Sequence, residues 1–383
     1  MIQIKDKEKC TGCTACATAC PAQCIVMRRD REGFDYPFVN SPDLCIGCGK
    51  CENICPVLHP LGVSEPLEAY SVRVPEHVEG SSSGGVFPAL AAKVIEEGGV
   101  VFGAVMNADM TVGHAEADTM AGLEKMRGSK YVQSDMYSSY DDVRMYLDEG
   151  RKVLFSGTPC QTAGLKAYLG REYGNLLAVD LACHGVPSPG LWEKYVTALE
   201  GRYGRLKEVS FRDKSQSWRN YAFTFCTADS KVSVPHIKDP YMALFLQDMT
   251  LRPSCHACPA KGGRSGSDVT LADLWNVAEV APEHDDDKGV SLAVANTAKG
   301  KDALAGSCAG MKVVPLSEAK KRNAGLDVSA PRPARRDEFF AGIHSVKDII
   351  SYMSGFVVHR GMARRCYERM HTLMSRLKSR LLK

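Results

Sequence analysis

The sequence has no long hydrophobic run. Apolar stretches such as residues 99–106 stop well short of the roughly 18 residues that a membrane-spanning helix requires. The chain begins Met1-Ile2-Gln3-Ile4-Lys5, without the apolar segment of a secretory signal. We therefore expect a cytoplasmic protein, in a compartment that keeps cysteine side chains reduced.

Two common nucleotide-binding motifs are also absent. Neither Gly-x-Gly-x-x-Gly nor the Walker phosphate loop occurs, so nothing indicates a conventional nicotinamide domain or an ATPase. No nucleophile and no acid–base pair stands out, and the sequence leaves the catalytic residues unknown. His184 could donate a proton, but we expect it to orient the loop around it.

Charge is nearly balanced over the chain but not at its C-terminal end. The net charge is +3, yet residues 360–383 carry eight Arg and Lys against the single Glu368. Apolar residues recur there at helical spacing, which predicts a basic amphipathic helix. Such a helix can lie on an anionic membrane surface or dock on this chain or a partner, and we favour docking. No nucleic-acid-binding module accompanies the charge, so we expect no nucleic acid partner.

Eight of the sixteen cysteines form two copies of one spacing near the N-terminus. Each copy has three cysteines separated by two residues, followed by a Cys-Pro pair, which is the pattern of bacterial ferredoxins with two 4Fe-4S clusters. In this pattern the fourth cysteine of each copy binds the other cluster. We therefore assign one cluster to Cys10, Cys13, Cys16 and Cys55, and the other to Cys45, Cys48, Cys51 and Cys20.

Disulfides and zinc explain this spacing less well. Disulfide frameworks belong to small secreted domains, whereas this chain has 383 residues. Structural zinc uses pairs of cysteines and not triplets followed by Cys-Pro. We interpret Cys24, which follows the first Cys-Pro pair, as a packed thiol and not as a ligand.

The rest of the chain alternates between strand and helix patterns. This predicts an α/β (α+β) body with some antiparallel additions, preceded by a ferredoxin-like domain and followed by a helical tail. We place the domains at 1–60, 61–330 and 331–383. Predicted strands cover 25–28, 34–39, 100–106, 152–155, 176–181, 269–271 and 291–294, and predicted helices cover 86–97, 140–149, 161–169 and 191–200.

Two further features suggest cofactor sites without defining them. The segment Gly80-Ser81-Ser82-Ser83-Gly84-Gly85 leads directly into a predicted helix and could hold a pyrophosphate, or it could be an ordinary serine cap. Cys255 and Cys258 have a metal-ligand spacing, whereas Cys160 and Cys183 follow predicted strands and could be buried small side chains. Spacing alone leaves this second site open.

Several ordered motifs resemble a known family. The segments that carry this resemblance are residues 81–87, 128–134, 155–161, 183–188, 211–214, 251–255 and 268–275. Together they resemble the β-subunit family of the coenzyme F(420) hydrogenases and dehydrogenases, in its bacterial form with an N-terminal 4Fe-4S dicluster ferredoxin domain. The resemblance extends from Cys10 to about residue 300.

The resemblance implies cofactors and a reaction. Relatives bind FAD beside a 4Fe-4S cluster, and the matching positions imply a third cluster on Cys160, Cys183, Cys255 and Cys258. The motifs that match the flavin site contain Ser82, Ser83, Gly84, Gly85, Lys130 and Thr158. Arg252, Arg264, Asp268 and Asp273 match family positions too, where each is either functional or part of a structural ion pair. Many relatives have Asp-Phe-Trp-Gly where this chain has Asp273-Leu274-Trp275-Asn276, so the backbone is expected to approach its neighbour less closely there.

The resulting hypothesis is an iron–sulfur flavoprotein oxidoreductase. Single electrons from a ferredoxin or another redox protein would pass through three clusters to FAD, and hydride would pass to a deazaflavin or another small organic acceptor, in a reaction that could also run in reverse. The alternative is an electron-transfer subunit that relays electrons to a partner enzyme. Bound flavin that a small molecule reoxidises would favour the oxidoreductase.

Overall fold

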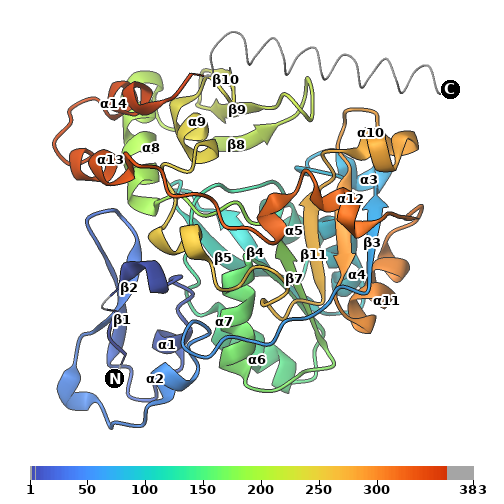
Figure 1. Cartoon of the computed structure of the whole chain (residues 1–383), viewed down its shortest axis with the longest axis horizontal. Coiled ribbons are helices and arrows are strands. Elements are labelled where there is room, and N and C mark those ends of the chain that lie inside the picture. The colour runs from blue at the N-terminus through green and yellow to red at the C-terminus, as the bar shows by residue number, and fades with distance from the viewer. Residues whose placement is uncertain (1, 5, 360–383) are drawn as a thin grey trace.

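The computed structural model describes residues 2–4 and 6–359. A mixed α/β body lies at the centre, a small two-cluster-type domain at the N-terminal side, and a third, helix-rich lobe above the body (Figure 1). The predicted basic helix at 360–383 lies outside the described residues. Among the residues that the structure describes, no helix is both long and apolar enough to cross a membrane.

An eight-stranded sheet forms the body. Its order is β13-β3-β12-β11-β7-β6-β4-β5, and only the four neighbours β11, β7, β6 and β4 run parallel to one another. The edge strands are antiparallel additions, as the sequence predicted. The strands are β3 (Glu68–Val72), β4 (Val100–Met106), β5 (Val112–Ala117), β6 (Val153–Gly157), β7 (Leu176–Leu181), β11 (Val269–Asp273), β12 (Ser291–Ala295) and β13 (Lys312–Val313).

Helices cover both faces of this sheet because its central strands are apolar on both sides. The helices of the body are α3 (Pro75–Val78), α4 (Val86–Glu96), α5 (Met120–Met126), α6 (Ser139–Asp148), α7 (Pro159–Leu169), α10 (Val277–Val280), α11 (Ala298–Ser307) and α12 (Leu316–Lys320). One core contains side chains of α4, α5 and α11, and the core on the opposite face contains those of α6 and α7. The carboxyl ends of the parallel strands stay open between these layers.

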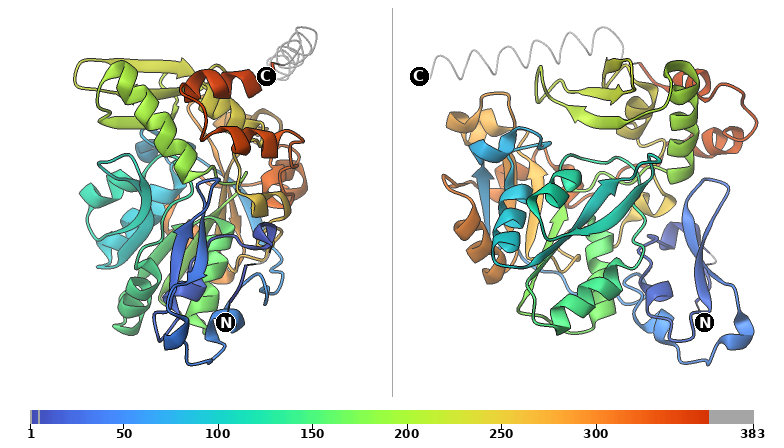
Figure 2. Two further views of the ribbon diagram at one scale, coloured as in Figure 1. Left: turned by 90° about the vertical axis from the view of Figure 1, so that its left-hand side faces the viewer. Right: turned by 180° about the vertical axis from the view of Figure 1, so that it is seen from behind.

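The third lobe has its own aromatic core. It comprises α8 (Pro189–Tyr203), β8 (Glu208–Asp213), β9 (Ala222–Cys226), β10 (Lys231–Pro235), α9 (Pro240–Leu246), α13 (Arg336–Gly342) and α14 (Ile349–Phe356). Trp192 and Tyr241 meet edge to face in this core beside Phe211 and Phe223, and Phe339 of α13 belongs to the same buried cluster. The view from behind shows the lobe over the edge of the sheet at which β4 and β7 end (Figure 2).

The N-terminal domain consists of two short helices and one hairpin. These are α1 (Ala15–Thr18), α2 (Lys50–Asn53), β1 (Ile25–Arg29) and β2 (Asp35–Val39). Helix α1 packs on α6 and α7, and Ala15 and Ala19 belong to the same buried cluster as side chains of those helices. Gly164 of α7 allows this close approach, since a Cβ there would lie 2.9 Å from Cβ of Cys13.

Every strand and helix that the sequence predicted within the described residues is present, with ends shifted by at most three residues. The sequence did not predict β3, β5, the β8–β10 sheet or α9. It did predict a helical segment at 331–383, and α13 and α14 lie in the described part of that segment. The α/β fold class with an N-terminal dicluster domain is confirmed.

Candidate functional site

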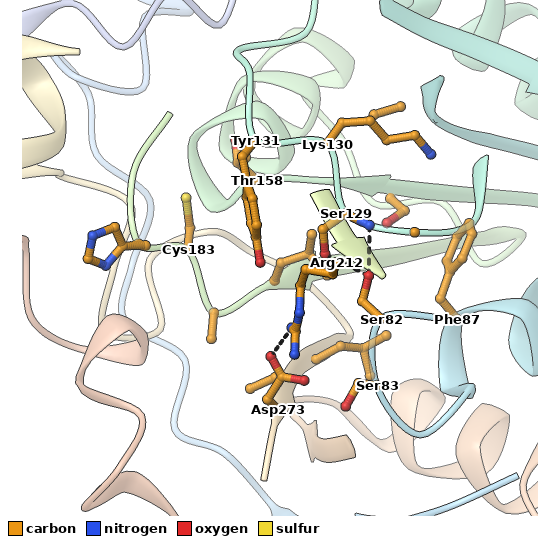
Figure 3. A pocket seen from close by; sticks show the side chains of 18 of the residues that line it. Ser82, Ser83, Phe87, Ser129, Lys130, Tyr131, Thr158, Cys183, Arg212 and Asp273 are labelled. Atoms are coloured by element: carbon orange, nitrogen blue, oxygen red, sulfur yellow. Dashed lines mark hydrogen bonds and ion pairs between the residues drawn. The ribbon is translucent and has the colours of Figure 1, made fainter. Parts of the chain in front are cut away.

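A cavity of about 430 Å³ lies at the carboxyl ends of the parallel strands. Residues at or just beyond the ends of β6, β7 and β11 line it, and so do Arg212, Tyr221 and Phe245 of the third lobe. Figure 3 shows Arg212 of this lobe beside Asp273 of β11. Open α/β sheets bind ligands at this edge, and the volume lies in the range of cofactor pockets. Five of the six predicted flavin residues line it: Ser82, Ser83, Gly85, Lys130 and Thr158.

The sixth, Gly84, lies behind the cavity wall. Its N–H donates to Oγ of Ser291, and a Cβ at this position would lie 2.3 Å from the carbonyl oxygen of Val72. Gly84 therefore allows the loop to pack on the sheet, whereas its neighbours face the cavity.

The serine-rich loop does not cap α4. The N-cap is Gly85, with φ of 86° and no side-chain cap, so the alternative of an ordinary serine cap is wrong. The Ser82 hydroxyl oxygen accepts hydrogen bonds from the backbone N–H and the hydroxyl of Ser129, at 2.7 and 2.8 Å, and Ser83 Oγ donates to the carbonyl of Val290. The first N–H groups of α4 are thus left at a cavity wall, where a helix favours an anion.

Lys130 uses its ammonium group within the protein. Nζ donates to the carbonyls of Arg127 and Lys125, at 2.8 and 3.1 Å, close to the end of α5. Burial lowers the pKa of Lys130 to about 7, because the charged form loses its hydration. Lys130 therefore contributes to the wall mainly by holding the loop that contains Ser129.

Sequence reasoning named Asp273 but missed its partner, Arg212. The Arg212 guanidinium is buried, and Nη1 lies 2.5 Å from Oδ2 of Asp273, which supports the structural ion pair considered for this aspartate. Asp273 Oδ1 also accepts a hydrogen bond from Trp218. The pair raises the pKa of Arg212 against the opposing effect of burial. Its Nε and Nη2 have no hydrogen-bond partner within the described residues, so two buried donors remain for a ligand.

The other family-matched charges have structural roles. Asp268 pairs with Lys299 at 3.2 Å and accepts from the backbone N–H of Ala178. Arg264 donates to the carbonyl of Lys261. Trp275, within the segment that departs from the family pattern, stacks on Trp218 with ring centroids 4.9 Å apart.

A second, smaller cavity adjoins the first. Cys160, Cys183, Cys255 and Cys258 all line it, so the structure brings together the four cysteines named for the third cluster. Cys160 lies in the first turn of α7, and Cys255 and Cys258 lie in and just after the 3-10 helix 253–257. Cys183, which follows β7, lines both cavities, and Thr158 Oγ1 lies 3.2 Å from Sγ of Cys160.

These four thiols suit a metal cluster better than an apolar core. Burial raises the pKa of Cys255 to about 11 and that of Cys183 to about 12, so bound iron would have to supply the positive charge that stabilises the thiolates. No group of three metal-binding side chains within the described residues is close enough to hold one ion. A four-iron cube binds each cysteine at a separate corner, so it does not need such a group.

The ferredoxin cysteines also form two sets. Cys20, Cys45, Cys48 and Cys51 line one cavity. Cys13 and Cys16 are close enough to Cys10 and Cys55 for the charges of these cysteines to influence one another. These are the crossed sets that the spacing predicted. Cys24 lines the same cavity as Cys20, with Sγ 3.5 Å from Sγ of Cys20, and it is buried, as expected of a packed thiol.

The ferredoxin set that contains Cys10 lies on the side of the N-terminal domain that faces the body. Thr11, between Cys10 and Cys13, lies in the wall of the four-cysteine cavity. Arg252, close in sequence to Cys255, donates to the carbonyl of Cys10 at 2.7 Å. We call the Cys10 set proximal and the Cys20 set distal. The order from the outside inward is distal set, proximal set, body cysteines and large cavity.

His184 lines the large cavity beside Cys183. Its Nε2 lies 2.6 Å from Oδ1 of Asp248. His114, in another wall, has its Nε2 3.0 Å from the carbonyl of Ser156, and burial lowers its pKa to about 4. A neutral His114 is therefore a fixed part of the wall at physiological pH, and His184 stays the nearer candidate for orienting the cysteine loop.

Comparison with known proteins agrees with this arrangement. Residues 9–58 match the family described as a 4Fe-4S dicluster domain. The fold and this match define an iron–sulfur protein in which a dicluster domain is docked on an α/β body. Residues 150–318 match the family described as the C terminus of the coenzyme F420 hydrogenase/dehydrogenase beta subunit. Two parts of the chain thus match the two parts of the resemblance found in its motifs, and that resemblance is confirmed.

One solved structure with a similar chain is a xenon derivative of the F420-reducing NiFe hydrogenase complex from Methanosarcina barkeri. The similarity covers 76% of this chain and 91% of that chain, with 19% sequence identity and a TM-score of 0.46. No curated protein matches the chain.

Proposed function

We propose that the chain is an iron–sulfur flavoprotein oxidoreductase. In this proposal residues 1–60 receive single electrons from a ferredoxin or another redox protein, residues 61–330 hold a third 4Fe-4S cluster and FAD, and residues 331–383 form a helical segment. When bound, FAD would supply the conversion between single-electron transfer and hydride transfer to a deazaflavin or another small organic acceptor. We propose a cytoplasmic location.

The observation that carries the proposal is that neighbouring sites share lining residues. Cys183 lines both the four-cysteine cavity and the large cavity, and Thr11 joins the four-cysteine cavity to the proximal set. An electron entering at the exposed distal cysteine, Cys48, would therefore meet each proposed site in succession. A chain that only relayed electrons would not need a 430 Å³ cavity at the end of this series.

The large cavity suits a flavin nucleotide. The free N–H groups at the start of α4 and the nearby side chain of Arg127 would hold the pyrophosphate. Tyr131 also lines the cavity, and the two unpartnered donors of Arg212 would hold polar atoms of the cofactor. We retain Ser82, Ser83, Gly84, Gly85, Lys130 and Thr158 as the flavin-binding loops, with their polar groups used to position the backbone.

Composition of the purified chain tests the proposal. Protein prepared without oxygen should contain about twelve irons, from three cubes of four, and flavin absorbance bands. The dithionite-reduced protein should then be mixed with candidate small acceptors and, separately, with candidate partner proteins. Reoxidation of bound flavin by a small molecule is the expected result.

Two results would contradict the proposal in different ways. Absence of flavin would remove the oxidoreductase function altogether. Flavin that no small molecule reoxidises, but that a partner protein does, would show that the chain is an electron-transfer subunit.

A further inference from the structure

Arg252 is a buried cation without a carboxylate partner. Its side chain is fully buried, yet no carboxylate oxygen of the described residues lies within 4.0 Å of its guanidinium. It donates to the carbonyls of Cys10 and Asp35, and its Nη2 lies 3.8 Å from Sγ of Cys10. Its other contacts are neutral too, since Nη1 donates to Oε1 of Gln133 at 3.0 Å and the guanidinium lies 4.1 Å from the ring centroid of Tyr36. A buried charge is normally paired with an opposite charge, and the described residues supply none to this arginine.

Lys261 is a second buried cation, and it lies beside the body cysteines. Only 5% of the residue is exposed, and the one hydrogen bond of its ammonium group within the described residues goes to the carbonyl of Val328. It lies in the wall of the four-cysteine cavity, where its charge reaches Cys183, Cys255 and Cys258. The charge of Arg252 also acts on Cys255. The body site therefore has two neighbouring cations, and the proximal site has one.

The distal site differs from both. Among the described residues, its cavity is lined only by cysteines, glycines, Pro21, Ala22, Ile25 and Ile46. Cys48 is exposed there. No buried cation contributes to this wall.

We propose that Arg252 and Lys261 are fixed positive charges that raise the reduction potentials of the proximal and body clusters above that of the distal cluster. The inference rests on the proposed function, and it adds a difference in reduction potential that favours the direction proposed there. Electrons that enter at the distal cluster then move to sites of higher potential as they approach the large cavity. Arg252 and Lys261 act as positioning charges and not as ligands.

The physical basis is the charge change on reduction. A cube held by four thiolates gains one negative charge with each electron, and a nearby cation stabilises the reduced form. In a dry interior this attraction is several times stronger than in water. Water around exposed Cys48 also stabilises a reduced distal cluster, so the proposal requires the two buried charges to outweigh that hydration.

An anaerobic redox titration followed by electron paramagnetic resonance tests the proposal. The full chain should show three one-electron cluster waves. Arg252→Gln and Lys261→Met should each lower the reduced-to-oxidised ratio of a higher wave about tenfold at a fixed potential, which corresponds to a midpoint about 59 mV lower. The lowest wave should stay where it is in both variants, because it belongs to the distal cluster.

Three controls separate charge from structure. Lys261→Arg and Arg252→Lys keep the positive charge. In both variants the midpoint potential of each cluster should stay close to its value in the unmodified chain. The double variant Arg336→Gln/Glu32→Gln removes another fully buried arginine together with the carboxylate that pairs with it at 2.6 Å, so it changes no net charge and should not move any wave. The Lys261 ammonium makes one hydrogen bond, so Lys261→Met tests the proposal even if Arg252→Gln fails to fold.

Each outcome is decisive. Midpoints that do not move, or a shift of the lowest wave, would overturn the inference while leaving three clusters and the proposed function intact. Fewer than three waves, or absence of flavin, would contradict the proposed function and with it the inference.

Discussion

The Cys183→Ala variant is expected to lose one four-iron cluster and to stop electron delivery to the large cavity. Cys183 is the cysteine whose position joins the four-cysteine cavity to the large cavity. Iron should fall by about four of about twelve atoms per chain, because three cysteines do not hold a cube firmly. The ferredoxin clusters should still be reduced by dithionite, whereas bound flavin should no longer be reduced on the time scale of the wild-type protein.

The matched control is Cys226→Ala. Cys226 is a half-buried cysteine of β9, outside all of the proposed ligand sets. This variant should keep its iron and its rate of flavin reduction. Full iron content in Cys183→Ala, or equal iron loss in both variants, would contradict the assignment of Cys183.

The Asp273→Leu variant is expected to destabilise the fold strongly. Arg212 would then be a buried cation without its partner, and loss of one member of a buried ion pair costs about 3–5 kcal/mol. Trp218 would also lose the acceptor for its indole N–H. The free energy of unfolding, measured by denaturant under anaerobic conditions, should fall accordingly.

The double variant Arg212→Met/Asp273→Leu separates stability from cofactor binding. It removes both charges, so most of the lost stability should return. Flavin content should not return, because the two donors of Arg212 that lack protein partners are gone. A double variant with full flavin would show that Arg212 does not hold the cofactor, and one as unstable as Asp273→Leu would show that the ion pair is not the cause.

The strands and helices of the body could be predicted because their burial is periodic. β4 and β7 are continuous apolar runs, and α7 starts at a proline after a strand. The sheet of the third lobe could not be found in this way, although helix α8 was, since β10 alternates only between half-buried and exposed residues and β8 is half-exposed. Its core depends on aromatic side chains that come from segments more than 150 residues apart, such as Trp192 and Phe356.

The cysteine sets could be predicted because the spacing of these cysteines along the sequence is typical of cluster ligands. The flavin contacts could not be predicted. Ser82 and Lys130 do lie at the cavity, yet their polar groups bind Ser129 and backbone carbonyls. Arg212 lies 61 residues from Asp273, and nothing in the sequence links the two. Cys24 is buried, as predicted for a packed thiol, but its place beside Cys20 in the distal cavity could not be predicted from spacing.

The most direct test of the account is the number of electrons that one chain accepts. Anaerobic titration of the full chain with a one-electron reductant, followed by absorbance, should consume about five electrons, one for each of three clusters and two for the flavin. An uptake of about three electrons without flavin bleaching, or of about two electrons from the ferredoxin clusters alone, would contradict the proposed series from the distal cysteines to the large cavity.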